Sequence, residues 1–171
     1  MEAFDHLVRA KGFIFSANDV IEARGNLAMF RAPVLHLLAH GAELLFKGVH
    51  LWHGATPDAL RKTYGHDIWA CWQALPEEAA EFRQIVEREA RDTWARAEEM
   101  GMVPEDSEYE DGWHHFTSML RDLSRLHTNE ESHALRYPKP GQEGMVPLHL
   151  LDTLAPAASW AVSEVLKARA A

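Results

Sequence analysis

The stretch PVLHLLAHGAELLFKGVHLWHG, residues 33–54, is strongly apolar and carries two regular stripes of side chains. The first stripe advances by four and three residues in alternation, which is the spacing of one face of an α-helix. Its positions are Leu37, Gly41, Leu44, Gly48 and Leu51. We predict a central helix that begins at Pro33 and ends before Gly54, with glycines that let a neighbouring helix approach closely.

The second stripe of this helix is polar and follows the same spacing one residue earlier. Its positions are His36, His40, Glu43, Lys47 and His50. Glu43 precedes Lys47 by four residues, the favourable order for an ion pair on a helix, and His40 lies one turn before Glu43. Because buried polar groups persist only when they are paired, the first interpretation is an internal hydrogen-bonded network that fixes the register of the helix. Its expected members are His40, Glu43, Lys47, His66 and Asp67.

A metal site is the alternative interpretation of the polar stripe. Two imidazoles and one carboxylate on one helix face are ligands that suit a transition metal. The set comprises His36, His40 and Glu43, completed by His66 or His114 from another helix. Lys47 places a positive charge beside this set, and the spacing matches no strong metalloprotease signature. We therefore assign no metal ion and no cofactor from the sequence.

Helical periodicity also dominates the rest of the chain, strands have almost no support, and no internal repeat is visible. The further helices are expected at about 3–24, in a short segment from about 67, at 77–101, at 109–127 and from about 148 onward. Pro156 falls inside the last of these and is expected to kink or restart it. The sequence therefore predicts an all-α fold, an up-and-down bundle of four to five helices in a single domain that spans residues 1–171.

The net charge of -9 is concentrated in one region of the chain. Residues 77–111 hold 13 acidic side chains and four arginines, whereas acids and bases balance elsewhere. Most of this charge is interpreted as the solvated face of an amphipathic helix. The segment EDSEYED, residues 105–111, disfavours broad contact with nucleic acid and would suit a basic partner.

Three further features bear on location. The longest stretches without Asp, Glu, Lys or Arg have 11 residues, well short of the ~18 that a membrane span needs. The first residues, MEAFDHLVRAK, mix acids and bases ahead of any apolar run, which fits neither a secretory signal nor a transit peptide. Cys71 is a lone cysteine and cannot form a disulfide within the chain. We expect a cytoplasmic protein without membrane contact.

The order of several residues resembles the HEPN family of small helical-bundle proteins. The matching residues are His40, Glu43, Leu44, Lys47, Gly54, Leu60 and Gly65-His66-Asp67, with Arg136-Tyr137-Pro138 later in the chain. The resemblance implies a bundle of four or five helices, often paired as a homodimer, in prokaryotic proteins. It also implies RNA cleavage or the binding of a nucleotide or a partner protein. From the residues alone, Gly65 permits a turn and Asp67 is expected to cap the helix that follows.

Catalytic members of the HEPN family carry an arginine and a histidine separated by four to six residues. Arg121 and His127 match this form, with five residues between them and Asp122 directly after the arginine. The resemblance implies that neutral His127 takes the proton of a ribose 2′-hydroxyl while Arg121 holds the phosphate, a reaction that needs no metal. The phosphate-binding residues expected near this pair are Arg125, Arg136 and Lys139.

Periodicity offers a second interpretation of His127. This residue continues an apolar stripe, which is typical of a core or interface position. The stripe consists of Tyr109, Trp113, Phe116, Leu120 and Leu123. Arg121 and His127 also lie about 120° apart around an ideal helix, so a single helix cannot bring them together. A catalytic site would therefore need a second subunit or a bent helix end.

The sequence leaves three functions open. The first is a metal-independent endoribonuclease that acts on RNA at a homodimer cleft, as a toxin or defence component with an antitoxin-like protein partner. The second is a non-catalytic HEPN-type module for dimerisation or for binding a nucleotide or another protein. The third is a metal hydrolase built on the polar stripe of the central helix.

Overall fold

The computed structural model describes residues 2–24, 27–128 and 148–170, with the side chains of 24 and 27–29 excepted. These ranges form seven α-helices and one 3₁₀ turn and contain no strand, which confirms the all-α class. The helices are α1 (Glu2–Arg24), α2 (Leu27–Trp52), α3 (Pro57–Tyr64), α4 (Ile68–Gln73), α5 (Ala80–Glu99), α6 (Gly112–His127) and α7 (Leu148–Ala170). The turn η1 (Glu77–Ala79) leads into α5.

The expected number of four to five helices is too low for the described ranges, because short helices follow α2. Helix α3 has eight residues and buries Leu60 alone, so it carries no periodic pattern long enough to recognise. Thr56 caps α3 by accepting a hydrogen bond from Ala59 N at 3.3 Å. Helix α4 begins after Asp67, whose Oδ1 accepts from Ala70 N at 2.9 Å. The capping role predicted for Asp67 is confirmed.

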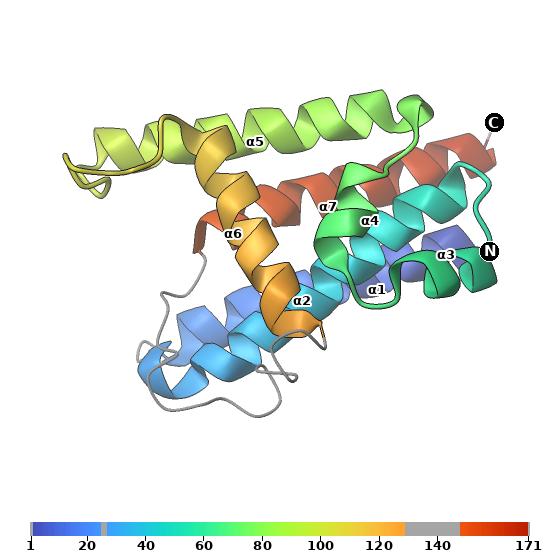
Figure 1. Ribbon diagram of the computed structural model, residues 1–171, viewed down its shortest axis with the longest axis horizontal. Helices are drawn as coiled ribbons and strands as arrows, with labels where there is room; N and C mark the ends of the chain where they lie inside the picture. Colours follow the sequence, from blue (N-terminus) through green and yellow to red (C-terminus); the bar gives the residue numbers. More distant parts are fainter. Residues whose placement is uncertain (1, 25–26, 129–147, 171) are drawn as a thin grey trace.

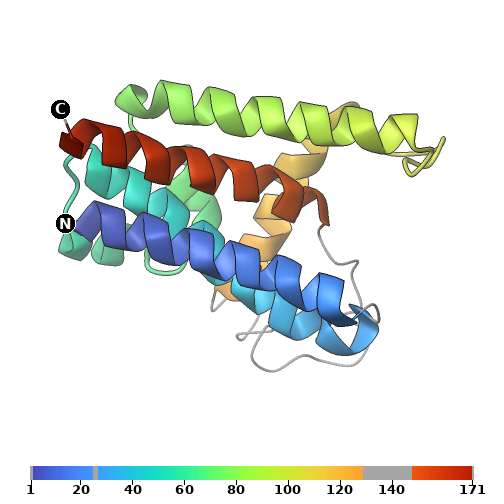
Figure 2. The same cartoon turned by 180° about the vertical axis from the view of Figure 1, so that it is seen from behind.

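The long helices are arranged in two layers. Helices α1, α7 and α5 lie side by side in one layer (Figure 2). Helix α2 packs against α1 from the other layer, which also contains α3 and α4 (Figure 1). Helix α6 crosses from α5 toward α2 (Figure 1), and its last residue, His127, reaches Glu43 in the middle of α2. This crossing places the end of α6 against the polar stripe.

Helices α1 and α2 approach closely where the glycines of the apolar stripe lie. A Cβ atom at Gly41 would come within 2.6 Å of Ile14 Cγ1, and one at Gly48 within 2.7 Å of Leu7 Cδ2. Both of these α1 side chains are fully buried. The predicted close approach is confirmed, and it fixes α1 against the face of α2 next to the polar stripe.

Two prolines lie inside helices rather than at their starts. The predicted start of the central helix at Pro33 is wrong, because α2 begins at Leu27 and includes Pro33. Pro156 lies inside α7, which continues through it, so the last helix does not restart there. Leu154 and Ala157 on either side of Pro156 are fully buried, and this burial outweighs one missing N–H donor.

The other helix boundaries fall near the expected positions. Helix α6 begins at Gly112, later than the expected 109, because Asp111 caps it by accepting from His114 N at 2.8 Å. None of the described helices combines the length and the apolar character that crossing a membrane demands.

Candidate functional site

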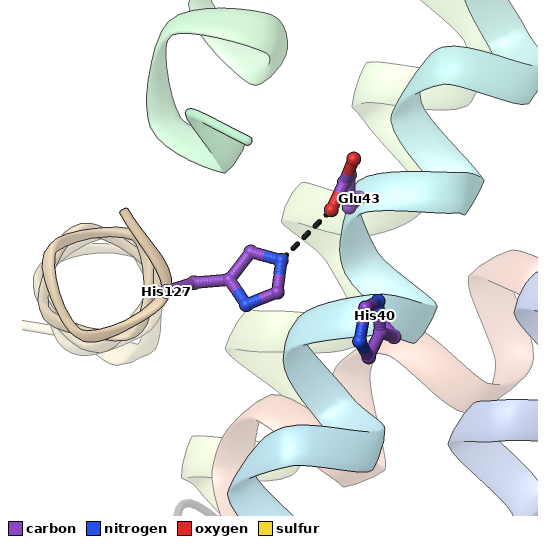
Figure 3. Close-up of side chains that lie close together, drawn as sticks. All are labelled: His40, Glu43 and His127. Carbon is purple, nitrogen blue, oxygen red and sulfur yellow. Dashed lines mark hydrogen bonds and ion pairs between the residues drawn. The ribbon is translucent and has the colours of Figure 1, made fainter. Parts of the chain in front are cut away.

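Glu43 is the centre of a buried polar network between α2 and α6 (Figure 3). Only 7% of this residue is exposed. Lys47 Nζ donates a hydrogen bond to its Oε1 at 2.6 Å, and His127 Nε2 donates to its Oε2 at 2.8 Å. His66 Nδ1 donates to Oε2 at 3.2 Å. Since His66 and His127 come from outside α2, the network joins three segments of the chain.

Lys47 also binds the turn between α3 and α4. Its Nζ donates to the carbonyl oxygen of Gly65 at 2.6 Å, in addition to its bond with Glu43. Gly65 adopts a φ of 52°, a left-handed conformation that glycine tolerates better than other residues. The turn therefore presents a carbonyl group to Lys47 and the next side chain, His66, to Glu43.

Two opposing effects set the pKa of Glu43. Burial raises the pKa because it disfavours the ionised form, whereas the hydrogen bonds from His127 and Lys47 lower it. The donors outweigh burial and bring the pKa to about 2. Glu43 is therefore a buried carboxylate that stays ionised at neutral pH and attracts cations.

Four imidazole rings form a connected series of ring contacts beside this carboxylate. The ring centroid of His40 lies 4.5 Å from that of His36 and 5.0 Å from that of His127. The ring of His66 lies 5.6 Å from that of His127. Burial, followed by the neighbouring imidazoles of His127 and His36, lowers the pKa of His40. His40 consequently favours the neutral form, in which one ring nitrogen can accept a hydrogen bond or bind a metal.

Arg121 and His127, the pair implied by the HEPN resemblance, occupy different sides of α6. His127 is 8% exposed and lies in the Glu43 network. Arg121 is exposed, and its guanidinium carbon lies 4.7 Å from the centroid of the Trp69 ring. A single copy of the chain therefore does not bring the two side chains together.

One of the three residues expected to bind phosphate near this pair, Arg125, lies within the described structure. Arg125 is exposed, and its Nη1 lies 3.7 Å from a carboxylate oxygen of Asp122 on the same helix. Arg136 and Lys139 lie outside the described residues.

Asp67 was expected in the polar network but bonds to α6 at a different point. Its Oδ1 accepts from Ser124 Oγ at 2.9 Å, and this Oγ accepts in turn from Trp69 N at 3.0 Å. Ser124 thus ties α6 to the start of α4. A single serine inside an amphipathic helix carries no signal in the sequence, which explains why Ser124 was missed.

The potential metal ligands in the structure differ from those that the stripe spacing indicated. Among the described His, Cys, Asp and Glu residues, one group of three has donor atoms within 4.8 Å of one another: His40, Glu43 and His127. The residues His36, His66 and His114 do not belong to it. His127 lies 84 residues from Glu43 in the chain, so no local pattern links the two.

A pocket of about 330 Å³ opens beside the network, where α1, α2, α3 and the turn after α3 meet. It is lined by His6, Glu43, Leu44, Lys47, Pro57, Leu60, Arg61, Gly65 and His66. Glu43 is the one carboxylate among these described lining residues, and it is already hydrogen-bonded to Lys47 and His66. The negative charge of Glu43 is therefore already paired with Lys47, and the pocket lining also contains the positively charged side chain of Arg61.

Comparisons of the chain with protein-family models, with curated proteins and with solved structures found no match. The function is therefore inferred from the residues of the network and the pocket.

Proposed function

We propose that this chain is a HEPN-type helical module that binds a phosphate-bearing small molecule of nucleotide size in the pocket beside Glu43. The observation that carries the proposal is the pocket lining, because six of its nine residues are among those that carry the resemblance. These six are Glu43, Leu44, Lys47, Leu60, Gly65 and His66. The volume of about 330 Å³ is near the lower end of the range for small-molecule sites.

The polar side chains of the pocket differ in how far they are exposed. The side chains of Glu43 and Lys47 are 9% and 13% exposed and form the inner end of the pocket. The side chain of His66 is 58% exposed and that of Arg61 is 75% exposed. The guanidinium of Arg61 is paired with Asp58 on the same helix, and an exposed pair of this kind exchanges readily for a phosphate. Arg61 can then offer two parallel donors to phosphate oxygens.

Calorimetric titration of the full chain with AMP, with ATP and with inorganic phosphate tests this proposal. The Arg61→Ala variant removes the exposed guanidinium and is expected to weaken binding about tenfold. Lys62→Ala is the matched control, because Lys62 is the next residue of α3, is exposed, carries the same charge and does not line the pocket. An equal loss in both variants, or no binding by the wild type, would contradict the proposal.

A metal-independent endoribonuclease is the second candidate, and the contact between His127 and Glu43 favours it. A carboxylate that accepts from one ring nitrogen fixes the tautomer and the orientation of an imidazole, so that the other ring nitrogen can accept a proton. In this mechanism Nδ1 of His127 takes the proton of a ribose 2′-hydroxyl, and the freed oxygen attacks the adjacent phosphorus. The bond from phosphorus to the 5′-oxygen of the next nucleotide breaks, and that oxygen leaves with a proton from water. Arg121 of a second copy holds the phosphate. With 8% exposure His127 must first become accessible, which ranks this function second.

RNA cleavage in the presence of EDTA tests the second candidate. Activity in the wild type that is lost in both Arg121→Ala and His127→Ala supports a nuclease, whereas an inactive wild type contradicts it. His114→Ala is the control, because His114 is an exposed histidine of the same helix. Sedimentation analysis of the same samples shows whether two copies associate, as a shared cleft requires.

A further inference from the structure

Three potential metal ligands converge where α6 meets α2. The donor atoms of His40, Glu43 and His127 lie within 4.8 Å of one another. Two of the residues are one helical turn apart on α2, and the third is the last residue of α6 (Figure 3). One ion at this point would join two helices that are far apart in the chain.

The surroundings of His40 leave its ring available to an ion. His40 makes ring contacts with Phe13, His36 and His127, and within the described part of the chain it forms no hydrogen bond. Glu43 and His127 already point toward each other at 2.8 Å, with a single proton between their atoms. A divalent cation can take the place of that proton.

The chemistry of the donors selects the ion. Two imidazoles and one carboxylate suit Zn²⁺, which binds three protein ligands together with a water molecule or a fourth side chain. Mg²⁺ and Ca²⁺ prefer oxygen ligands and have one carboxylate here. We propose that His40, Glu43 and His127 bind one Zn²⁺ ion between α2 and α6.

Binding of the ion rearranges one hydrogen bond of the network. Zn²⁺ takes the place of the Nε2 hydrogen of His127, and the ring stays neutral by changing tautomer, so that its one hydrogen moves to Nδ1. Glu43 then binds the ion through Oε2 while Oε1 keeps its bond with Lys47, which lies at 2.6 Å. The nearby ammonium group repels the ion and limits its affinity, but it leaves the coordinating oxygen accessible.

This inference goes beyond the phosphate pocket and does not depend on it. His40 and His127 do not line the pocket, whereas Arg61 does. Arg61→Ala is therefore expected to keep Zn²⁺ binding, and His40→Ala to keep nucleotide binding. The two proposals can fail separately.

Calorimetric titration of the metal-free full chain with ZnCl₂ tests the site, with MgCl₂ as the comparison ion. The wild type is expected to bind one Zn²⁺ per chain and no Mg²⁺. His40→Ala is expected to weaken Zn²⁺ binding at least about tenfold. It leaves the bonds of Glu43 to Lys47 and His127 in place, so the variant should remain folded, as circular dichroism can verify. His114→Ala is the matched control and should bind like the wild type.

Zn²⁺ binding that is unchanged in His40→Ala would overturn the proposal. The wild type's failure to bind one Zn²⁺ ion per chain would also overturn it.

A second measurement needs no variant. Co²⁺ in a site with few ligands absorbs visible light more strongly than the six-coordinate aqueous ion. Strong absorption at one equivalent of Co²⁺ supports the site, and the weak spectrum of the aqueous ion overturns it.

Discussion

Two histidine-rich clusters of this molecule differ in that the first contains a buried carboxylate, Glu43, paired with Lys47. The first is the Glu43 network between α2 and α6. The second lies between α5, α6 and α7, where the rings of His115 and His149 are 4.7 Å apart beside Trp94. His149 Nε2 donates to the carbonyl oxygen of Gly112 at 3.0 Å. Within the described residues, His115 Nδ1 has no hydrogen-bond partner.

The two clusters differ in the charge of their central group. In the second cluster burial, then the neighbouring His115, lowers the pKa of His149 to about 4. Burial and His114 likewise lower the pKa of His115. In the first cluster the hydrogen bonds of Glu43 overcome the effect of burial and keep the carboxylate ionised. Burial therefore favours neutral histidines in the second cluster, and His40 in the first cluster is shifted in the same direction. The first cluster differs because, among the described residues, it alone contains a buried carboxylate that stays ionised.

The largest expected effect comes from removing that charge. Glu43→Gln leaves the ammonium of Lys47, whose side chain is 13% exposed, without its counter-ion and is expected to lower the free energy of unfolding by about 3 to 5 kcal/mol. Urea unfolding followed by circular dichroism measures this loss. The double variant Glu43→Leu with Lys47→Met removes both charges and should recover most of the stability. A loss below about 1 kcal/mol in Glu43→Gln would show that the first cluster does not depend on its carboxylate.

As the pH falls, the second cluster should lose its contribution to the stability of the fold before the first cluster does. The pKa of His149 is about 4 in the folded chain, below its usual 6.5, so the unfolded chain binds a proton that the folded chain does not. Stability therefore falls as the pH decreases from 6.5 to about 4, by up to about 3 kcal/mol from this group. The contribution of Glu43 is present above pH 4.5 and is lost as the pH falls toward 2.

Urea unfolding of the wild type and of His149→Gln at several pH values between 7 and 4.5 measures the difference. The variant should lose less stability than the wild type across this range. Parallel losses in the two proteins would mean that His149 is not the group that titrates.

A larger side chain at Gly112, beside the second cluster, should destabilise the fold. A Cβ atom at Gly112 would collide with the backbone oxygen of Ala90 and with Trp94 Cβ. Gly112→Ala is therefore expected to destabilise the fold by about 1 to 3 kcal/mol in thermal or urea unfolding. Gly12→Ala is the matched control, because no atom lies within 4 Å of its added Cβ, and it should be stabilising by about 0.5 to 1 kcal/mol. Equal effects of the two variants would disagree with the observed packing.

The smallest effect is expected outside both clusters. Arg121→Ala removes an exposed guanidinium that lies over Trp69, a contact worth about 0.5 to 1 kcal/mol. Its thermal unfolding should stay close to that of the wild type. A large loss of stability would instead assign Arg121 a structural role. A loss of RNA cleavage in this variant would then not identify Arg121 as a catalytic residue.

The parts of the fold that depend on local periodicity could be predicted from the sequence. The spacing of Gly41 and Gly48 predicts the close approach of α1, and Asp67 predicts the start of α4. The start of α2 could not be predicted, because the preference of Pro33 for a first turn is overridden in the folded chain.

The candidate site was predicted only in part. Glu43 and Lys47 are neighbours on one helix, so their contact follows from their spacing. His127 reaches Glu43 because α6 crosses α2. The local periodicity of a sequence does not indicate how two distant helices cross. Arg121 and His127 lie on different sides of α6, as their spacing of six residues on one helix predicts.

Lys47 provides a way to follow the site without an assay of function. One ammonium group binds both the Glu43 carboxylate and the Gly65 carbonyl, so a ligand that draws Lys47 away from Gly65 also loosens the turn that follows α3. The amide of Asp67, which donates to the Tyr64 carbonyl at 2.8 Å, lies in that turn. Its rate of exchange with deuterium is therefore a local reporter of what occupies the pocket.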